Sequence, residues 1–175
     1  SDKLLRFDMS LYQSLTDIPR LIGSSDSGEQ GILTEAIQGH PYSTLLLDEL
    51  EKAHHDLLNI FLTIFDEGYF INGSGRRIDC KHLIIIATSN IEHIESVFSP
   101  EFINRFDGVV PFNALDASNI LSIARSIAEE ISRNYVQLHN IHITVTDTLL
   151  QQIVTNHYDK RYGARDVQRL ISSAV

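Results

Sequence analysis

Short apolar runs alternate with amphipathic stretches over the first two thirds of the chain. The runs occupy residues 4–7, 43–47 (STLLL), 83–88 (LIIIAT) and 109–112 (VVPF). Unbroken apolar runs of this length are typical of strands buried on both faces in a parallel sheet. Two segments that lie between these runs carry apolar side chains at helical spacing, residues 32–38 and 54–65. Strands that alternate with helices predict a parallel α/β sheet.

Turn-forming residues separate some of these elements. Residues 69–80 contain Asn72-Gly73 and a further glycine at Gly75, which predict a β-hairpin. Residues 23–31 (GSSDSGEQG) hold almost no apolar side chain and predict a loop.

The pattern becomes mostly helical from residue 116 onward. Asp116 or Ser118 is a suitable N-cap for a long helix, and Thr146-Asp147 suits the start of another. Residues 141–145 alternate between apolar and polar side chains and predict an edge strand. A final helix is predicted from about residue 163 and is still apolar at the last residue.

Two domains follow from this change of pattern. We predict a sheet domain over residues 1–113 and a small, mostly helical domain over residues 114–175, which the end of the chain is expected to truncate. The length of 175 residues suits one sizeable core and one small one.

Composition narrows the class of protein. A net charge of −9 disfavours nucleic acid as a partner, because nucleic-acid binders gather Lys and Arg on one face. No apolar run approaches the ~20 residues that a membrane-spanning helix needs, so no membrane contact is expected. The single cysteine, Cys80, cannot form an internal disulfide, and no signal segment opens the sequence. A reducing, cytoplasmic location is therefore expected.

Two adjacent carboxylates follow the second apolar run. Asp48-Glu49 after STLLL has the form of a Walker B element, in which one acid holds Mg²⁺ through water and the next polarises the attacking water. The same pair also suits a helix N-terminus, where acids complement the helix dipole. The motif by itself leaves both interpretations open.

Three further residues are candidates for chemistry at phosphate groups. Asn90 follows the next predicted strand and offers an uncharged donor and acceptor, while Arg105 and Arg165 offer planar charged forks. Taken singly, Asn90 is better explained as an ordinary turn residue. Arg105 is as easily explained as a partner in a surface ion pair, and the alternative for Arg165 is a position on a helix surface.

The order and spacing of these residues form a single pattern, which resembles the carboxy-terminal ATPase module of the ClpA, ClpB and ClpC unfoldases. The resemblance covers nearly the whole chain. The stretches that carry it are RFDMS (6–10), RLIG (20–23), LTEA (33–36), PYSTLLLDELEKAHHD (41–56), TSN (88–90), PEFINRFD (100–107) and YGAR (162–165).

The resemblance implies an AAA+ fold and a set of residue roles. Asp48 and Glu49 match Walker B, Asn90 matches sensor 1, Arg105 matches the arginine finger and Arg165 matches sensor 2. It also implies ATP and Mg²⁺ as cofactors, hexameric rings, and unfolded or aggregated proteins as substrates. A protease or co-chaperone is a further partner that the family suggests.

The phosphate-binding loop GxxxxGK[ST] is absent from the sequence, because none of the four lysines follows a glycine. In the family this loop and its strand lie upstream of RFDMS, so the chain is expected to start partway into the module. The missing strand would lie between the sensor 1 strand and residues 109–112. We therefore expect a gap in the sheet and weak or no ATP binding by this chain alone.

Residues 23–31 are the second departure from the family. Relatives carry an aromatic Gly-Tyr-Val-Gly pore loop here, whereas GSSDSGEQG has no aromatic residue. Two functions from different classes remain: a protein-remodelling ATPase, or a catalytically impaired assembly module that keeps its ring interface without threading substrate. The loop itself also raises the hypothesis of a ring that assembles and hydrolyses ATP without pulling substrate. A nucleic-acid-acting AAA+ protein is disfavoured by the acidity and by EKAH and YGAR.

The remaining histidines give weaker signals. His139 and His142 have a spacing seen in some metal sites, but they lack a third ligand nearby and are read as part of a strand edge. His54-His55 is read as a helix start.

Overall fold

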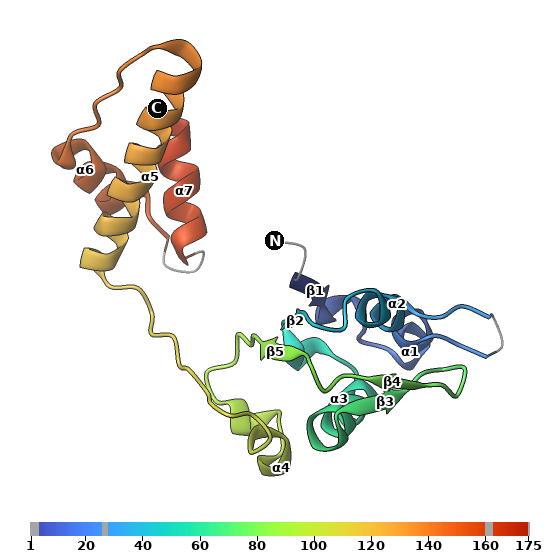
Figure 1. Ribbon diagram of the computed structural model, residues 1–175. Helices are drawn as coiled ribbons and strands as arrows, with labels where there is room; N and C mark the ends of the chain where they lie inside the picture. The colour runs from blue at the N-terminus through green and yellow to red at the C-terminus, as the bar shows by residue number, and fades with distance from the viewer. Residues whose placement is uncertain (1–3, 26–27, 160–162, 175) are drawn as a thin grey trace. The chain divides into compact units, whose positions relative to one another are not determined.

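The chain divides into two compact units, residues 1–109 and 110–175 (Figure 1). The computed structural model describes residues 4–25, 28–159 and 163–174. Each unit has its own hydrophobic core. The units are therefore described separately.

Unit 1 is built on a parallel three-stranded sheet. The strands are β1 (Leu4–Asp8), β2 (Thr44–Asp48) and β5 (Ile84–Ala87), in the order β1-β2-β5. The register pairs Asp8 with Asp48, so the two strands end side by side. The predicted parallel sheet is confirmed for these three runs.

Helices and a hairpin complete unit 1. The α-helices are α1 (Ile18–Ile22), α2 (Ile32–Gly39), α3 (His55–Glu67) and α4 (Pro100–Ile103). Short 3-10 turns lie at η1 (Met9–Leu11), η2 (Leu15–Asp17), η3 (Leu50–Lys52) and η4 (Ile94–Ser96). The predicted hairpin is β3 (Tyr69–Ile71) paired with β4 (Arg77–Asp79).

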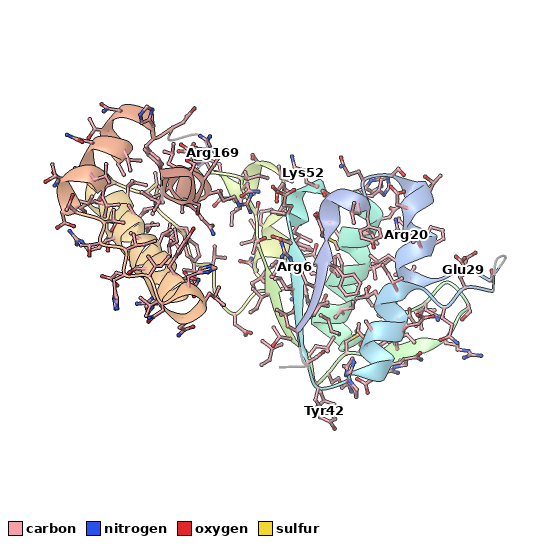
Figure 2. All side chains as sticks on the ribbon, turned by 90° about the horizontal axis from the view of Figure 1, so that it is seen from above. Arg6, Arg20, Glu29, Tyr42, Lys52 and Arg169 are labelled. Carbon is pink, nitrogen blue, oxygen red and sulfur yellow. The ribbon has the colours of Figure 1, made fainter. Side chains whose placement is uncertain are left out.

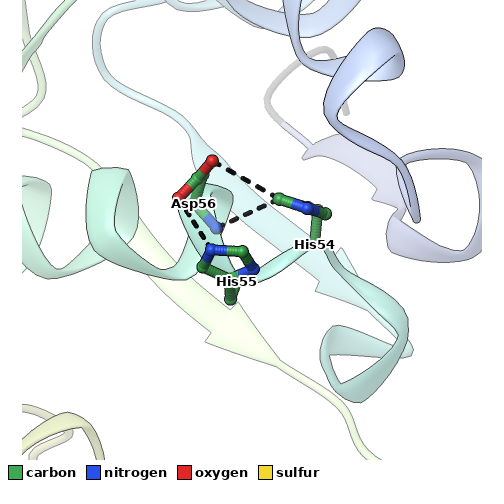
Figure 3. Close-up of side chains that lie close together, drawn as sticks. All are labelled: His54, His55 and Asp56. Atoms are coloured by element: carbon green, nitrogen blue, oxygen red, sulfur yellow. Dashed lines mark hydrogen bonds and ion pairs between the residues drawn. The ribbon is translucent and has the colours of Figure 1, made fainter.

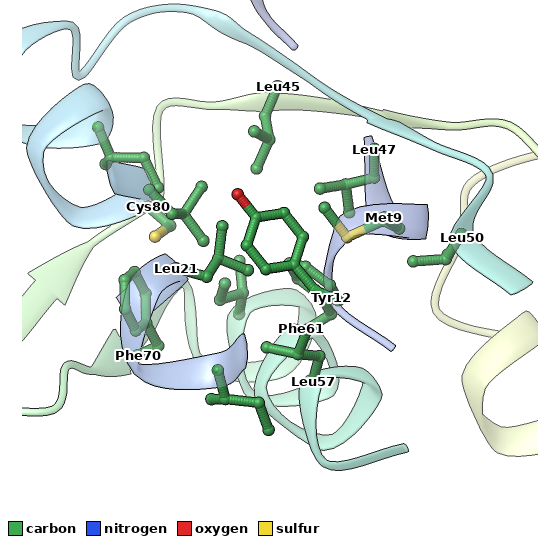
Figure 4. Close-up of a cluster of buried hydrophobic side chains, with 14 of the residues drawn as sticks. Met9, Tyr12, Leu21, Leu45, Leu47, Leu50, Leu57, Phe61, Phe70 and Cys80 are labelled. Atoms are coloured by element: carbon green, nitrogen blue, oxygen red, sulfur yellow. The ribbon is translucent and has the colours of Figure 1, made fainter. Parts of the chain in front are cut away.

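The sheet buries one face and leaves much of the other open. Leu45 and Leu47 are fully buried and belong to the same core as Tyr12 and Phe61 (Figure 4). On β5, by contrast, Ile84 and Ile86 are 66% and 48% exposed. Burial of residues 83–88 on both faces was thus a wrong expectation, because β5 is an edge strand whose outward face has no cover among the described residues.

The fourth predicted strand does not form. Residues 109–112 lie outside any strand, and Val110 and Phe112 are 75% and 94% exposed. An isolated strand gains no ladder hydrogen bonds, and Pro111 removes one backbone donor. The gap expected in the sheet is consistent with this run finding no partner beside β5.

Unit 2 is helical. It contains α5 (Ala117–His139), α6 (Asp147–His157) and α7 (Gly163–Ala174). Asp116 accepts a hydrogen bond from the Asn119 amide, and Thr146 accepts one from the Leu149 amide, so both predicted N-caps are confirmed. The buried side chains of the unit form its core: Ile120, Ala124, Ala128, Leu150, Val167 and Ile171.

The edge strand predicted at residues 141–145 is absent, since no strand is assigned in the described part of unit 2. Without a neighbouring strand, the alternating side chains pack on helices instead. Val145 packs against the helical core, and the Ser132 hydroxyl donates to the Ile143 carbonyl at 2.6 Å.

These observations confirm the predicted fold class, a small parallel α/β sheet followed by a helical unit. Within the described residues, no helix is both long enough and apolar enough to cross a membrane.

Candidate functional site

The carboxyl ends of β2 and β5 bring the predicted site residues together. Asp48 is the last residue of β2, and Thr88 directly follows β5. Parallel strands end at the same edge of a sheet, which is where ligands bind in open α/β folds. Asp48, Glu49 and Asn90 are all found at this edge.

Thr88 joins the two strand ends. Its hydroxyl donates to Oδ1 of Asp48 at 2.5 Å and accepts the backbone N–H of Glu49 at 3.2 Å. Its carbonyl accepts the backbone N–H of Leu50 at 2.9 Å. The side chain of Asp48 and the backbone that follows it are therefore fixed by one residue of the neighbouring strand.

Glu49 has an unusual backbone conformation. Its φ of 55° and ψ of 49° lie in the left-handed region, which costs a side-chain-bearing residue roughly 1–2 kcal/mol. Such strain persists where the surroundings hold the backbone in place, and it is concentrated at functional sites. Here the bond to the Thr88 hydroxyl and the start of η3 provide that restraint.

Asn90 is held by two glutamates. Its side-chain amide donates to Oε1 of Glu49 at 3.2 Å, and its backbone N–H donates to Oε1 of Glu51 at 3.3 Å. The other carboxylate oxygen of Glu51 is buried and has no hydrogen-bond partner among the described residues. The two acids together set the position of Asn90 relative to Glu49.

Arg6 adds a positive charge to the same edge. Its guanidinium forms an ion pair with Oδ2 of Asp48, and its side chain is 63% exposed. Figure 2 labels Arg6, which lies on β1. Arg6 reaches the site because β1 runs beside β2 in parallel register, with Arg6 opposite Leu46. The pair offsets part of the negative charge that gathers where β1 and β2 end.

Arg105 lies apart from this group of carboxylates. Its Nε is 2.6 Å from Oδ1 of Asp66, and its guanidinium is 3.9 Å from Glu101. Asp66 lies near the end of α3, roughly 16 Å along the helix axis from its start. The structure does not bring Arg105 to Asp48 within this chain.

Arg165 lies in the first turn of α7 in unit 2 and is exposed. The neighbouring Asp166 is buried and accepts the Asp159 backbone N–H at 2.8 Å and the Arg169 guanidinium at 2.7 Å. These hydrogen bonds, with that from Asp159 the larger, lower the pKa of Asp166. The start of α7 is thereby fixed, although Tyr162 of the YGAR stretch falls outside the described residues.

Three glycines hold the base of loop 23–31 against the hairpin. The backbone N–H of Gly73 donates to the Ile22 carbonyl at 3.1 Å, and a Cβ at Gly73 would lie 1.8 Å from the Gly23 carbonyl oxygen. A Cβ at Gly31 would lie 2.1 Å from the Gly23 nitrogen. No side chain larger than hydrogen fits at Gly73 or Gly31 without moving the backbone.

Three other residues singled out in the sequence have structural rather than catalytic positions. Cys80 is 4% exposed, and burial, with a smaller contribution from Asp79, raises its pKa to about 12. His54 is the N-cap of α3, as expected for a helix start, and its Nδ1 accepts the Asp56 amide at 3.3 Å. His139 ends α5, so its interpretation as part of a strand edge was wrong.

The arrangement suits the metal and water side of a nucleotide site. Carboxylate oxygens are the ligands that Mg²⁺ prefers, and Asp48 offers a carboxylate at the sheet edge. Glu49 and Asn90 extend this polar edge with a second acid and an amide within hydrogen-bond distance. The phosphate cradle GxxxxGK[ST] is not among the 175 residues.

Comparison with known families agrees with this geometry. Residues 1–109 match the family described as AAA domain (Cdc48 subfamily), and residues 115–175 match the C-terminal, D2-small domain of ClpB protein. The chain belongs to the Clp-type AAA+ proteins. Its two units correspond to the two parts of their C-terminal module.

Relatives over the whole chain agree. The ATP-binding subunit ClpE of the ATP-dependent Clp protease from Streptococcus pneumoniae is 34% identical, with 100% of this chain and 27% of the relative covered. The chaperone protein ClpB of Mycoplasma genitalium is 35% identical, covering 98% and 26%. Chloroplastic ClpD1 of Oryza sativa is 33% identical, covering 98% and 22%. The chain spans about a quarter of the length of these relatives.

Thr88, Arg6 and Glu51 are the site residues that sequence reasoning did not single out. Arg6 joins the site through the parallel pairing of β1 with β2, which places it opposite Leu46, two residues before Asp48. Thr88 and Glu51 lie within the family stretches at residues 88–90 and 41–56, but their hydrogen bonds to Asp48 and Asn90 are visible only in the folded structure.

Proposed function

We propose that this chain is part of a Clp-type protein-remodelling ATPase, which couples hydrolysis of Mg-ATP to unfolding or disaggregation of other proteins. The hydrogen-bonded group of Asp48, Glu49 and Asn90 at the carboxyl edge of the sheet is the observation that carries the proposal. The family match supports ATP as the nucleotide.

Each member of the group has a separate task in this proposal. Asp48 holds Mg²⁺ through its water shell, and the carboxylate of Glu49 orients and polarises the attacking water. Asn90 donates to Glu49 and so fixes the direction in which that carboxylate points. Thr88 keeps Asp48 and the Glu49 backbone in register with one another.

The arginines act from outside this group. In the proposed hexameric ring, Arg105 reaches the nucleotide of a neighbouring subunit, which is consistent with its ion pairs to Asp66 and Glu101, and not to Asp48, within one chain. Arg165 contacts the nucleotide bound to its own subunit. We also propose a cytoplasmic location, unfolded or aggregated protein substrates, and a protease or co-chaperone as a further partner.

The decisive experiment uses the longer protein that carries the phosphate loop. Glu49→Gln is expected to abolish ATP turnover while ATP binding is retained, because the amide occupies the same space without acting as a base. Unchanged turnover would remove Glu49 from the mechanism. For the 175-residue chain alone, calorimetry is expected to show weak or no ATP binding, and micromolar affinity would contradict that expectation.

A second candidate is an assembly module that hydrolyses ATP without threading substrate. Residues 23–31 favour it, because they offer no aromatic side chain to grip a polypeptide. An aromatic introduced at Ser27, which lies outside the described residues, separates the two functions. No gain in unfolding by the longer protein would count against this second candidate.

A further inference from the structure

Two imidazoles and a carboxylate meet at the start of α3. His54, His55 and Asp56 each offer one ligand atom, and these atoms all lie within 4.8 Å of one another (Figure 3). Nδ1 of His54 is 3.7 Å from Oδ2 of Asp56, and Nε2 of His55 is 3.1 Å from Oδ1 of the same carboxylate. Both rings therefore face one acid.

These distances suit a shared metal ion. Nitrogen and oxygen ligands bind zinc at about 2.0–2.2 Å, so neighbouring ligands around one ion are separated by about 3.0 Å at right angles and about 3.5 Å at tetrahedral angles. The two observed separations, 3.1 and 3.7 Å, differ from this range by a few tenths of an ångström at most. The two ring nitrogens lie within 4.8 Å of one another, and side-chain rotations that bring them closer would place all three ligand atoms around one ion.

The backbone beneath the cluster is already fixed. The His54 N–H donates to the Tyr12 carbonyl at 2.9 Å, and the His54 carbonyl accepts the Leu57 N–H at 2.9 Å. The two imidazole rings lie against one another with centroids 4.2 Å apart. The backbone that carries these ligands is therefore already ordered, which lowers the conformational entropy lost when an ion binds.

The ligand types select the class of ion. Neutral imidazole favours zinc, nickel and copper, whereas Mg²⁺ and Ca²⁺ prefer oxygen alone. Two effects oppose binding: the positive end of the helix dipole, and the weak bond from the Asp56 amide to His54 Nδ1 at 3.3 Å, which the ion displaces. The negative charge of the Asp56 carboxylate offsets the helix dipole. The bond between the ion and Nδ1 of His54 replaces the hydrogen bond that is lost.

We propose that His54, His55 and Asp56 form a binding site for a divalent transition-metal ion of the zinc class. Water completes the coordination, since His55 is 76% exposed and the cluster supplies three protein ligands. This site is separate from the carboxylates that the proposed function assigns to Mg²⁺, and it does not depend on nucleotide.

Calorimetry with Zn²⁺ and with Mg²⁺ on the 175-residue chain tests the site. Zn²⁺ is expected to bind and Mg²⁺ not to compete with it. His55→Gln and His54→Asn are each expected to weaken the affinity for Zn²⁺ at least tenfold. Asparagine at position 54 keeps an N-cap acceptor for α3, so loss of binding is not a consequence of losing the helix start.

His142→Gln is the matched control, because His142 is an exposed histidine outside the cluster. It should leave the Zn²⁺ affinity unchanged. The ring ¹⁵N resonances of His54 and His55 should shift on adding Zn²⁺. The proposal is overturned if the chain with both cluster substitutions binds Zn²⁺ as tightly as the unaltered chain, or if the control weakens binding equally.

Discussion

Glu49 combines backbone strain with the proposed chemistry. Its left-handed conformation is one that glycine adopts freely and alanine does not. The free energy of unfolding of Glu49→Gly should therefore exceed that of Glu49→Ala by about 1 kcal/mol. In urea titrations, Glu49→Gly should accordingly unfold at the higher urea concentration. Both substitutions remove the carboxylate, so the comparison isolates the backbone.

A parallel pair at Asn59 provides the control. Asn59 is an exposed residue in the interior of α3, where glycine is less stable than alanine by about 1 kcal/mol. Asn59→Gly should thus be less stable than Asn59→Ala, the reverse of the order at position 49. The same order at both positions would mean that Glu49 is not left-handed in solution.

Cys80 is predicted to be chemically inert in the folded protein. Its thiol is buried, and the pKa of about 12 leaves almost no thiolate at pH 8. Alkylation by iodoacetamide at pH 8 should be at least a hundredfold slower in buffer than in urea. Comparable rates would show that the β4 end of the core opens readily.

The same pKa shift has a consequence for stability. A thiol with a folded pKa above its unfolded value of about 8.5 stabilises the fold below that pH. The contribution is lost as the pH rises from the unfolded value toward the folded one. Cys80→Ala should remove this part of the decline in stability above about pH 8.5, which urea titrations across the pH range would measure.

For single residues, the sequence predicted those members of the candidate site that a local sequence pattern marks. Asp48, Glu49 and Asn90 follow apolar runs, and the structure places them within hydrogen-bond distance of one another or of Thr88. Thr88 itself gave no such signal. Thr88 belongs to the site because strand pairing places its hydroxyl beside the carboxylate of Asp48. The pairing of strands cannot be read from a local stretch of sequence.

Among the elements, predictions succeeded where periodicity and end signals agreed. The α3 helix has a clear apolar stripe, and Gly68 ends it in a left-handed conformation. The runs at residues 109–112 and 141–145 had only β-type patterning, and neither forms a strand. A strand requires a partner, and whether a partner is in place is a property of the fold rather than of the run.

Gly73 is expected to couple the hairpin to loop 23–31. In Gly73→Ala, the new Cβ would meet backbone atoms of Gly23 and Ser24, which cannot rotate away. Overpacking of this kind costs about 1–3 kcal/mol. Hydrogen exchange should also become faster at the Gly73 and Ser24 amides, which bond to Ile22 and Glu29.

Gly108→Ala is the matched control for this clash. A Cβ at Gly108 has no atom within 4 Å, and its φ is not positive. It should leave stability and exchange in loop 23–31 unchanged, or raise stability slightly. If Gly73→Ala behaves like this control, the hairpin and the loop are not held together in solution.

For the whole molecule, the main consequence is that two hydrophobic cores share one chain. The larger core gathers around Leu45, Leu47 and Phe61, and the smaller around Ile120, Leu150 and Ile171. None of the buried residues belongs to both cores. Each unit should therefore unfold in its own transition.

Leu150→Ala tests this independence in the full chain. Replacing a fully buried leucine by alanine costs about 2–5 kcal/mol, and the core of a unit this small rarely supplies more than about 3–5 kcal/mol of stability. The substitution should therefore unfold most or all of residues 110–175. Amide exchange in β1, β2 and α3 should stay slow.

Leu45→Ala is the reciprocal change, because Leu45 is equally buried in the other core. It should accelerate exchange in the sheet and leave α5 and α7 protected. Loss of protection across both units from either substitution would mean that they fold as one cooperative body. Such cooperativity would transmit changes between Asp48 and the helix that carries Arg165, whereas independent units would leave that coupling to the nucleotide and the ring that we propose.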